Sequence, residues 1–363
     1  MIQQRRYDID WLRVIAIFLL LIYHIAIVFQ PWATLIGFMR SDDLLEQLWI
    51  PMTFLNVWRI PLLFFVSGMG VYFAMQRRSI KELLVDRAKR ILFPYLFGIV
   101  AIVPLHIFIF QKFYHLPLRY TAHPAHLWFL GNIIIYISIL FPLFRWLVLN
   151  PTNKFNKTLN QLFSHPLGVI SITAFFVAEG LIVDPEVFAM YAQTLHGYVI
   201  GFLAFFFGFV LVYAGQTFWQ TVTKWKFLYF FIAMAFFVIR LSVFQNSSPN
   251  YLMAIESNLW IFTLFGFSYT YLNRPSKTLT YLSEAVYPVY IIHMVVLYAV
   301  SAMVLPLTLD AFPKFAIIVI VTGLSSWVIY EFVIKQVSFL RAPFGMRVKK
   351  GSLFFDKSAR SIA

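Results

Sequence analysis

The chain has 363 residues, of which 61% are hydrophobic and only 12% charged, and its formal net charge is +14. A soluble domain carries about 25% charged residues, so this composition excludes a soluble globular protein and predicts a polytopic membrane protein built from α-helices. The sequence contains no cysteine, which excludes disulfide bonds, thiolate nucleophiles and cysteine-based metal sites.

Apolar stretches of about 20 residues, long enough to span a bilayer, recur along the whole chain. We expect about ten transmembrane helices, at residues 12–30, 58–75, 91–112, 127–148, 166–183, 196–214, 227–245, 251–272, 281–304 and 314–334. If the N-terminus is cytoplasmic, most of the 29 lysines and arginines fall on the cytoplasmic side, as the positive-inside rule requires.

The sequence therefore predicts an all-α membrane bundle with both termini in the cytoplasm. We divide it into a membrane domain at residues 1–335 and a basic cytoplasmic tail at residues 336–363. The positive-inside pattern also explains the net charge, so no nucleic acid partner is expected.

The first apolar helix, in "WLRVIAIFLLLIYHIAIVFQPW" (11–32), contains both Arg13 and His24. At about 100° per residue the two side chains share one helix face, roughly 16 Å apart along the axis. Arg13 fits an interfacial anchor paired with Asp10, three residues earlier. His24 fits either a hydrogen bond between helices or a general base, because ionisable residues inside membranes often mark functional sites.

A basic inner loop, "SIKELLVDRAKRILFPY" (79–95), supplies a second set of residues. Ser79 and Glu82 have the spacing of a capping box that opens a helix. Arg87 and Arg90, three residues apart, are predicted to share one face, where two guanidinium groups suit a phosphate-rich ligand. The alternative is an ordinary cytoplasmic loop that binds lipid headgroups.

Four charged residues are predicted in the outer halves of helices: Arg59, Glu179, Arg240 and Glu256. Isolated charges are costly at that depth, so we expect these side chains, with nearby His196, to face each other or a polar substrate-binding cavity. The outer stretch before residue 127 holds three histidines without cysteine or a clear carboxylate partner, so no metal site is expected: His115, His123 and His126.

Several segments, taken in order, match a known pattern: "DIDWLRVIA" (8–16), "RIPLLFFVSG" (59–68), the Arg87/Arg90 pair, "LWFLGNIIIYI" (127–137), "YPVYIIHMVVL" (287–297) and "YEFVIK" (330–335). From about residue 7 to 335 the chain resembles the acyltransferase 3 family of integral membrane O-acyltransferases.

This resemblance implies a fold, an activity and roles for individual residues. The family moves an acyl group from a cytoplasmic acyl-CoA, usually acetyl-CoA, to a hydroxyl of an extracytoplasmic carbohydrate or related acceptor. Arg87 and Arg90 would hold the CoA phosphates, and His24 would deprotonate the acceptor or carry the acyl group briefly. Arg13 would orient His24 or the donor.

The resemblance also implies a location in the cytoplasmic (inner) membrane, among membrane lipids, and no metal cofactor. Arg59 would border the acceptor cavity. We expect Glu331 to hold the last helix through Lys335, four residues later, and His293 to be structural.

Two other functions would also retain charges inside a membrane. One is a transporter or flippase of a polar or glycan substrate, whose usual sequence signature is a pair of interrupted helices in matching halves. No such match is visible in this sequence. The other is a non-catalytic sensor or scaffold, which predicts no binding of CoA by Arg87 and Arg90.

Overall fold

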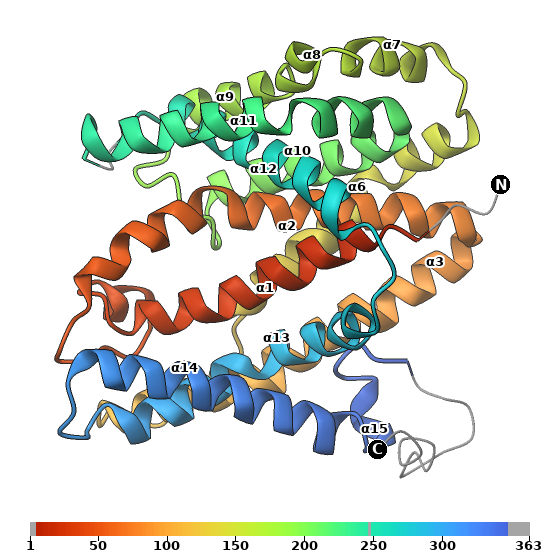
Figure 1. Ribbon diagram of the computed structural model, residues 1–363. Helices are drawn as coiled ribbons and strands as arrows, with labels where there is room; N and C mark the ends of the chain where they lie inside the picture. Colours follow the sequence, from red (N-terminus) through yellow and green to blue (C-terminus); the bar gives the residue numbers. More distant parts are fainter. Residues whose placement is uncertain (1–4, 246–247, 348–363) are drawn as a thin grey trace. The chain divides into compact units, whose positions relative to one another are not determined.

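The computed structural model describes residues 5–245 and 248–347, and every regular element in these ranges is helical (Figure 1). The predicted all-α class is therefore confirmed. Of the predicted basic tail, residues 348–363 lie outside the described part of the chain.

The chain divides into two compact units. The first unit comprises Met1–Ala16, Thr53–Leu83 and Asn132–Leu279, and the second unit comprises Ile17–Met52, Leu84–Gly131 and Thr280–Ala363. Five helices contribute residues to both units: α1 (Tyr7–Ile27), α2 (Trp49–Arg77), α3 (Ile80–Arg87), α6 (Trp128–Leu149) and α13 (Lys277–Val304).

Among the described residues, eight helical stretches are long and apolar enough to cross a membrane. They are Tyr7–Ile27, Glu46–Arg77, Ile80–Phe113, Ala125–Leu149, Leu195–Tyr213, Gln216–Ser242, Lys277–Val304 and Ala311–Ile334. Each overlaps one of the predicted spans, so the polytopic membrane architecture is confirmed. The bent pair formed by Lys154–Phe163 and Pro166–Ile182 raises the number to at most nine.

The two remaining predicted spans differ from simple transmembrane helices. Residues 166–183 form two short helices, α8 (Pro166–Ile170) and α9 (Thr173–Ile182), after a 115° bend that follows α7 (Lys154–Phe163). Pro166 starts α8 because proline is tolerated in the first turn of a helix but not in its interior. Residues 251–272 are helical, in α12 (Asn250–Leu272), but α12 is not among the eight apolar stretches.

The first unit contains all the helices between residues 150 and 275. Helix α12 packs along α11 (Gln216–Ser242) and α9, and α9 also contacts α10 (Leu195–Tyr213). Helices α2 and α10 approach so closely that a Cβ at Gly68 would overlap the Phe205 carbonyl and one at Gly208 the Phe65 carbonyl, which is the use of small residues expected between membrane helices. The helices wholly in this unit are α7, α8, α9, α10 (Leu195–Tyr213), α11 (Gln216–Ser242) and α12.

The second unit is built around the second half of α1 and most of α13. In its core, Phe29, two residues after the end of α1, packs edge-on against Phe315 of α14 (Ala311–Val328), and Met294 and Leu297 of α13 belong to the same core. The elements wholly in this unit are α4 (Phe93–Phe97), α5 (Val103–Phe113), α14 (Ala311–Val328), α15 (Ser338–Arg341), the 3-10 helices Ala33–Ile36, Glu46–Leu48 and Ala125–Leu127, and the π-helical turns Ala88–Leu92, Gly98–Ile102 and Ile329–Ile334.

The helical stretch Ile80–Phe113 contains two of these π-helical turns, and each directly precedes an α-helix with a proline in its first turn. Pro94 and Pro104 have no amide hydrogen, so the regular α-helical hydrogen bond to the residue four positions earlier is absent there. The wider π-turns accommodate that interruption without ending the span.

Candidate active site

His24, the predicted base, contacts His293 of α13 within the second unit. The Nδ1 atom of His24 lies 2.9 Å from the Nε2 atom of His293. The two rings are nearly parallel, with an interplanar angle of 7°, and their centroids are 5.2 Å apart. Because the two nitrogens are much closer than the centroids, the rings meet edge to edge, which is the geometry of a nitrogen-to-nitrogen hydrogen bond.

The opposite edge of His293 is also engaged. Its Nδ1 atom lies 2.6 Å from the backbone carbonyl oxygen of Tyr290, one helical turn earlier in α13. Only 1% of His293 is exposed, whereas His24 is half-buried. His24 is therefore the more accessible member of a continuous chain that ends at a backbone carbonyl.

Aromatic rings enclose this pair. Phe38 packs against His24 at a centroid distance of 5.5 Å, and His126 packs edge-on against His293 at 5.1 Å. His126 also turns its Nε2 atom towards the Ile291 carbonyl oxygen, 3.1 Å away, and contacts the ring of His106. The rings that contact His24 and His293 thus belong to the second unit.

No metal site is found among the described residues, because no three histidine, aspartate or glutamate side chains are grouped to hold an ion. His123, which the sequence pairs with His126, instead accepts a hydrogen bond from the Ala125 amide in its own turn.

Arg13 lies on the same continuous helix as His24, as predicted, but in the part of α1 that belongs to the first unit. Its Nη2 atom is 3.2 Å from the Asp10 carboxylate, which confirms the predicted ion pair, and 43% of its side chain is exposed. Asp10 also accepts from Arg5. The role of Arg13 towards the base or the donor stays a prediction.

The Arg87/Arg90 pair lies where α3 ends. The predicted capping box is confirmed: the Glu82 carboxylate accepts from the Ser79 amide at 2.9 Å, and the Ser79 hydroxyl accepts from the Glu82 amide at 3.3 Å. Arg90, however, lies in a π-helical turn, in which three residues cover less of a turn than in an α-helix. Its Nε atom lies 2.8 Å from the Asp86 carboxylate. That the two guanidinium groups share one face and bind phosphate stays a prediction.

The C-terminal region of the second unit makes two further sets of contacts, around Glu331 and around Gly345. The predicted pair of Glu331 and Lys335 is confirmed, with 2.7 Å between the carboxylate and the ammonium group, and Tyr281 donates to the same carboxylate at 2.8 Å. Gly345, at φ +69°, lies against the Tyr287 ring and the Arg90 carbonyl, so the chain after α15 packs directly beside the arginine pair.

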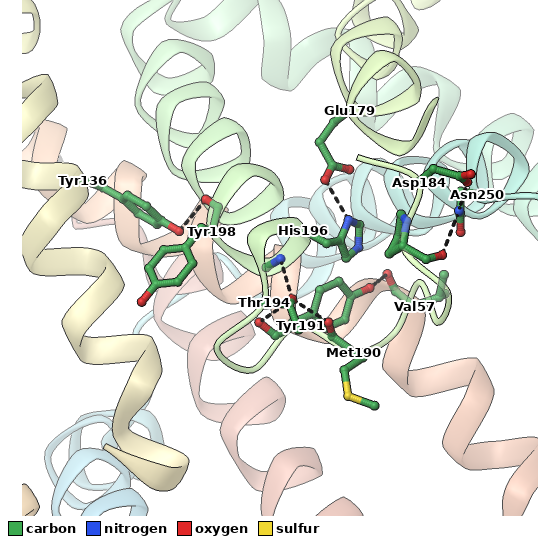
Figure 2. A network of polar contacts seen from close by, with 12 residues as sticks. Val57, Tyr136, Glu179, Asp184, Met190, Tyr191, Thr194, His196, Tyr198 and Asn250 are labelled. Atoms are coloured by element: carbon green, nitrogen blue, oxygen red, sulfur yellow. Dashed lines mark hydrogen bonds and ion pairs between the residues drawn. The ribbon is translucent and has the colours of Figure 1, made fainter. Parts of the chain in front are cut away.

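The predicted charges of the first unit are buried in pairs. Figure 2 shows Glu179 pointing at His196, with 2.7 Å between its carboxylate and Nδ1. Arg240 binds Glu256 through two hydrogen bonds of 2.7 and 2.8 Å and also donates to the Thr53 carbonyl.

Arg59 is 2% exposed and its Nη2 atom is 3.4 Å from the Asn56 side-chain oxygen. The Glu179–His196 contact and the Arg240–Glu256 ion pair agree with the expectation that these side chains face one another, whereas Arg59 contacts the neutral Asn56. Whether any of these residues contacts an acceptor stays a prediction.

The sequence also matches a model of a known protein family, described as an acyltransferase domain, over residues 6–331. The chain belongs to the acyltransferase 3 family. The match spans His24, Arg87, Arg90 and His293, so all four lie within the family domain. No curated protein and no solved structure matches the chain. Family membership and the apolar helices together identify a membrane acyltransferase.

Sequence reasoning did not identify His293 as a partner of His24, because 269 residues separate them and no spacing rule connects α1 to α13. The one indication in the sequence is that His293 is an ionisable residue in the middle of an apolar helix, a class of residue that is expensive to bury and often functional.

Proposed function

We propose that this acyltransferase 3 protein takes an acyl group, such as acetyl, from cytoplasmic acyl-CoA and transfers it to a hydroxyl of an extracytoplasmic carbohydrate or related acceptor. The proposed location is the cytoplasmic (inner) membrane. The observation that carries the proposal is the position of His24 in a protein of this family: its imidazole lies among the rings of the second unit and is hydrogen-bonded to His293.

In the proposed reaction, His24 is the general base. Its imidazole removes the proton of the acceptor hydroxyl while that oxygen attacks the thioester carbonyl carbon. The new carbon–oxygen bond forms, the carbon–sulfur bond breaks, and the proton held by His24 passes to the departing CoA thiolate. The reaction needs no metal and leaves the protonation state of the enzyme unchanged.

Arg87 and Arg90 are proposed to bind the CoA phosphates, because guanidinium groups donate several hydrogen bonds to phosphate oxygens. Both belong to the second unit, as does His24. Arg13 is proposed to orient His24 or the donor. Arg59, Glu179, Arg240 and Glu256 are assigned a structural role, because each side chain contacts a polar partner inside the first unit. Binding of the acceptor by these four residues is the alternative.

The proposal is tested with membranes that contain His24→Ala or the wild type and are supplied with radiolabelled acetyl-CoA. We expect the variant to lower the transfer rate about 10²- to 10⁴-fold, the usual contribution of a general base. His115→Ala, at an exposed loop position, is the control for histidine loss. Full activity of His24→Ala at equal abundance would contradict the role of His24.

An assay with the same membranes distinguishes an acyltransferase from a transporter or flippase. The acyltransferase labels an acceptor on the far side only when acyl-CoA is present, and it moves no unmodified acceptor across the bilayer. Flux of an unmodified glycan without any labelling would instead support transport.

A further inference from the structure

The Tyr290 carbonyl determines which nitrogen of His293 carries hydrogen. A carbonyl oxygen only accepts hydrogen bonds, so the Nδ1 atom of His293, 2.6 Å away, must be the donor. The second nitrogen of a neutral imidazole then carries the lone pair. His293 is expected to be neutral, because it is 1% exposed and a buried charge without a partner is costly. Its Nε2 atom is therefore an acceptor.

This acceptor in turn determines the tautomer of His24. The Nδ1 atom of His24 is 2.9 Å from that lone pair, so Nδ1 must carry the hydrogen and the lone pair of His24 must lie on Nε2. We infer that His293 is a positioning residue that holds His24 in the one tautomer whose Nε2 atom can accept a proton. The inference rests on the proposed function of His24 as the base.

Packing opposes the alternative arrangements. A flipped His293 ring would remove Nδ1 from the Tyr290 carbonyl and Nε2 from His24. A partial rotation of the ring out of its plane would disturb the edge-on contact with His126 and the stacking with the Tyr290 ring, whose centroid is 5.8 Å away. The Phe38 ring packs against the His24 ring, with 5.5 Å between the centroids, and restricts its rotation. The orientation of the base is therefore determined by the tertiary structure and not by free rotation of its side chain.

The arrangement also stabilises the base after it has accepted a proton. When the acceptor hydroxyl gives its proton to Nε2, His24 becomes an imidazolium and its Nδ1–H bond to His293 becomes charge-assisted, hence stronger. His293 keeps its own hydrogen on Nδ1, pointing at the Tyr290 carbonyl. The proton on Nε2 then leaves with the CoA thiolate, and both rings return to their starting tautomers.

The inference is tested with two substitutions of His293. His293→Gln keeps a side-chain oxygen that can accept from His24 Nδ1–H, whereas His293→Leu fills similar space without an acceptor. We expect His293→Leu to lower kcat about 10²- to 10³-fold, approaching the loss seen when a catalytic histidine is held in the wrong tautomer. The KM for acyl-CoA should stay within about twofold, because the lost interaction acts in the chemical step.

His293→Gln should restore kcat to within about tenfold of the wild type, because the acceptor is present again. The matched control is His106→Gln. His106 is also buried and packs against His126 and Tyr298, and we expect this control to change kcat less than about threefold. Equal losses for His293→Leu and His293→Gln, or an equal loss for His106→Gln, would show a structural role and overturn the inference.

A second readout does not depend on activity. In protein labelled with ¹⁵N-histidine and held in lipid nanodiscs, the His24 resonances are assigned by their absence in His24→Ala. We expect a protonated Nδ1 and an unprotonated Nε2 in the wild type, and a mixture of tautomers in His293→Leu. A mixture in the wild type would overturn the inference even if the enzyme is active. A single tautomer in a protein that transfers no acyl group would refute the proposed function and leave the positioning by His293 intact.

Discussion

Two buried polar networks, one in each unit, use their hydrogen-bonding groups differently. In the first unit, Arg240 and Glu256 are joined by two hydrogen bonds, and neither side chain is more than 2% exposed. In the second unit, His24 and His293 form a hydrogen-bonded chain of rings that ends at a carbonyl. The first network neutralises charges, and the second orients a lone pair.

The difference shows what each network contributes to the protein. A buried ion pair whose members satisfy each other offers no group to a ligand, and its loss leaves an uncompensated charge. A chain of imidazoles leaves one nitrogen at its accessible end as an acceptor whose direction is set by the rest of the chain. We therefore assign a structural role to the Arg240–Glu256 pair and propose chemistry for His24, and each assignment can be tested separately.

The largest expected effect is on the ion pair. Arg240→Ala should lower the free energy of unfolding by about 3–5 kcal/mol, because it leaves the Glu256 carboxylate buried without its partner. Thermal unfolding of the detergent-solubilised protein measures the change.

The double variant Arg240→Met/Glu256→Leu removes both charges and should stay close to the wild type in stability. It should also retain acyl transfer. A stable double variant that has lost transfer would show that this pair binds the acceptor. It would contradict the purely structural role assigned to the pair.

The next effect concerns donor binding in the second unit. Replacing both Arg87 and Arg90 by alanine should raise the KM for acyl-CoA at least 10- to 100-fold, since each charged hydrogen bond contributes about 1.5–3 kcal/mol. The value of kcat should change little, because the phosphates are bound equally in the ground and transition states. Lys89→Ala, an exposed position in the same π-helical turn, is the control.

An acyl-pantetheine donor that has no nucleotide phosphates sharpens this experiment. The wild type and the double variant should have the same high KM for acyl-pantetheine. For the double variant, this KM should be no higher than its KM for acyl-CoA. If the double variant weakens acyl-CoA and acyl-pantetheine equally, the two arginines do not act on the phosphates.

The smallest effect is expected at the start of α3, the helix that leads to Arg87. Ser79→Ala removes the capping hydroxyl that the Glu82 amide donates to and should cost about 0.5–2 kcal/mol of helix stability. Ser79→Thr, which keeps a capping hydroxyl, should stay near the wild type. The measurement is hydrogen exchange of the α3 amides. We expect faster exchange in Ser79→Ala and not in Ser79→Thr. Equal exchange in both variants would show that packing and not the cap holds α3.

Local sequence patterns predicted many single elements correctly, because their causes are local. The capping box of Ser79 and Glu82, the ion pair of Asp10 and Arg13, and the pair of Glu331 and Lys335 each join residues three or four positions apart. Residues at that spacing are neighbours on any α-helix. The same spacing joins Arg90 to Asp86, four positions earlier, a pair that the sequence analysis did not name.

Composition and short-range spacing by themselves determined the class of the protein, most of its membrane helices and the residues on which chemistry could depend, including His24. The tertiary structure alone decided which of the buried polar residues meet. It paired Glu179 with His196 and Arg240 with Glu256, and it brought His293 to the ring of His24. The reason is physical: hydropathy reports how deep a side chain lies in the membrane, whereas the rotation of one packed helix against another determines which side chains face each other.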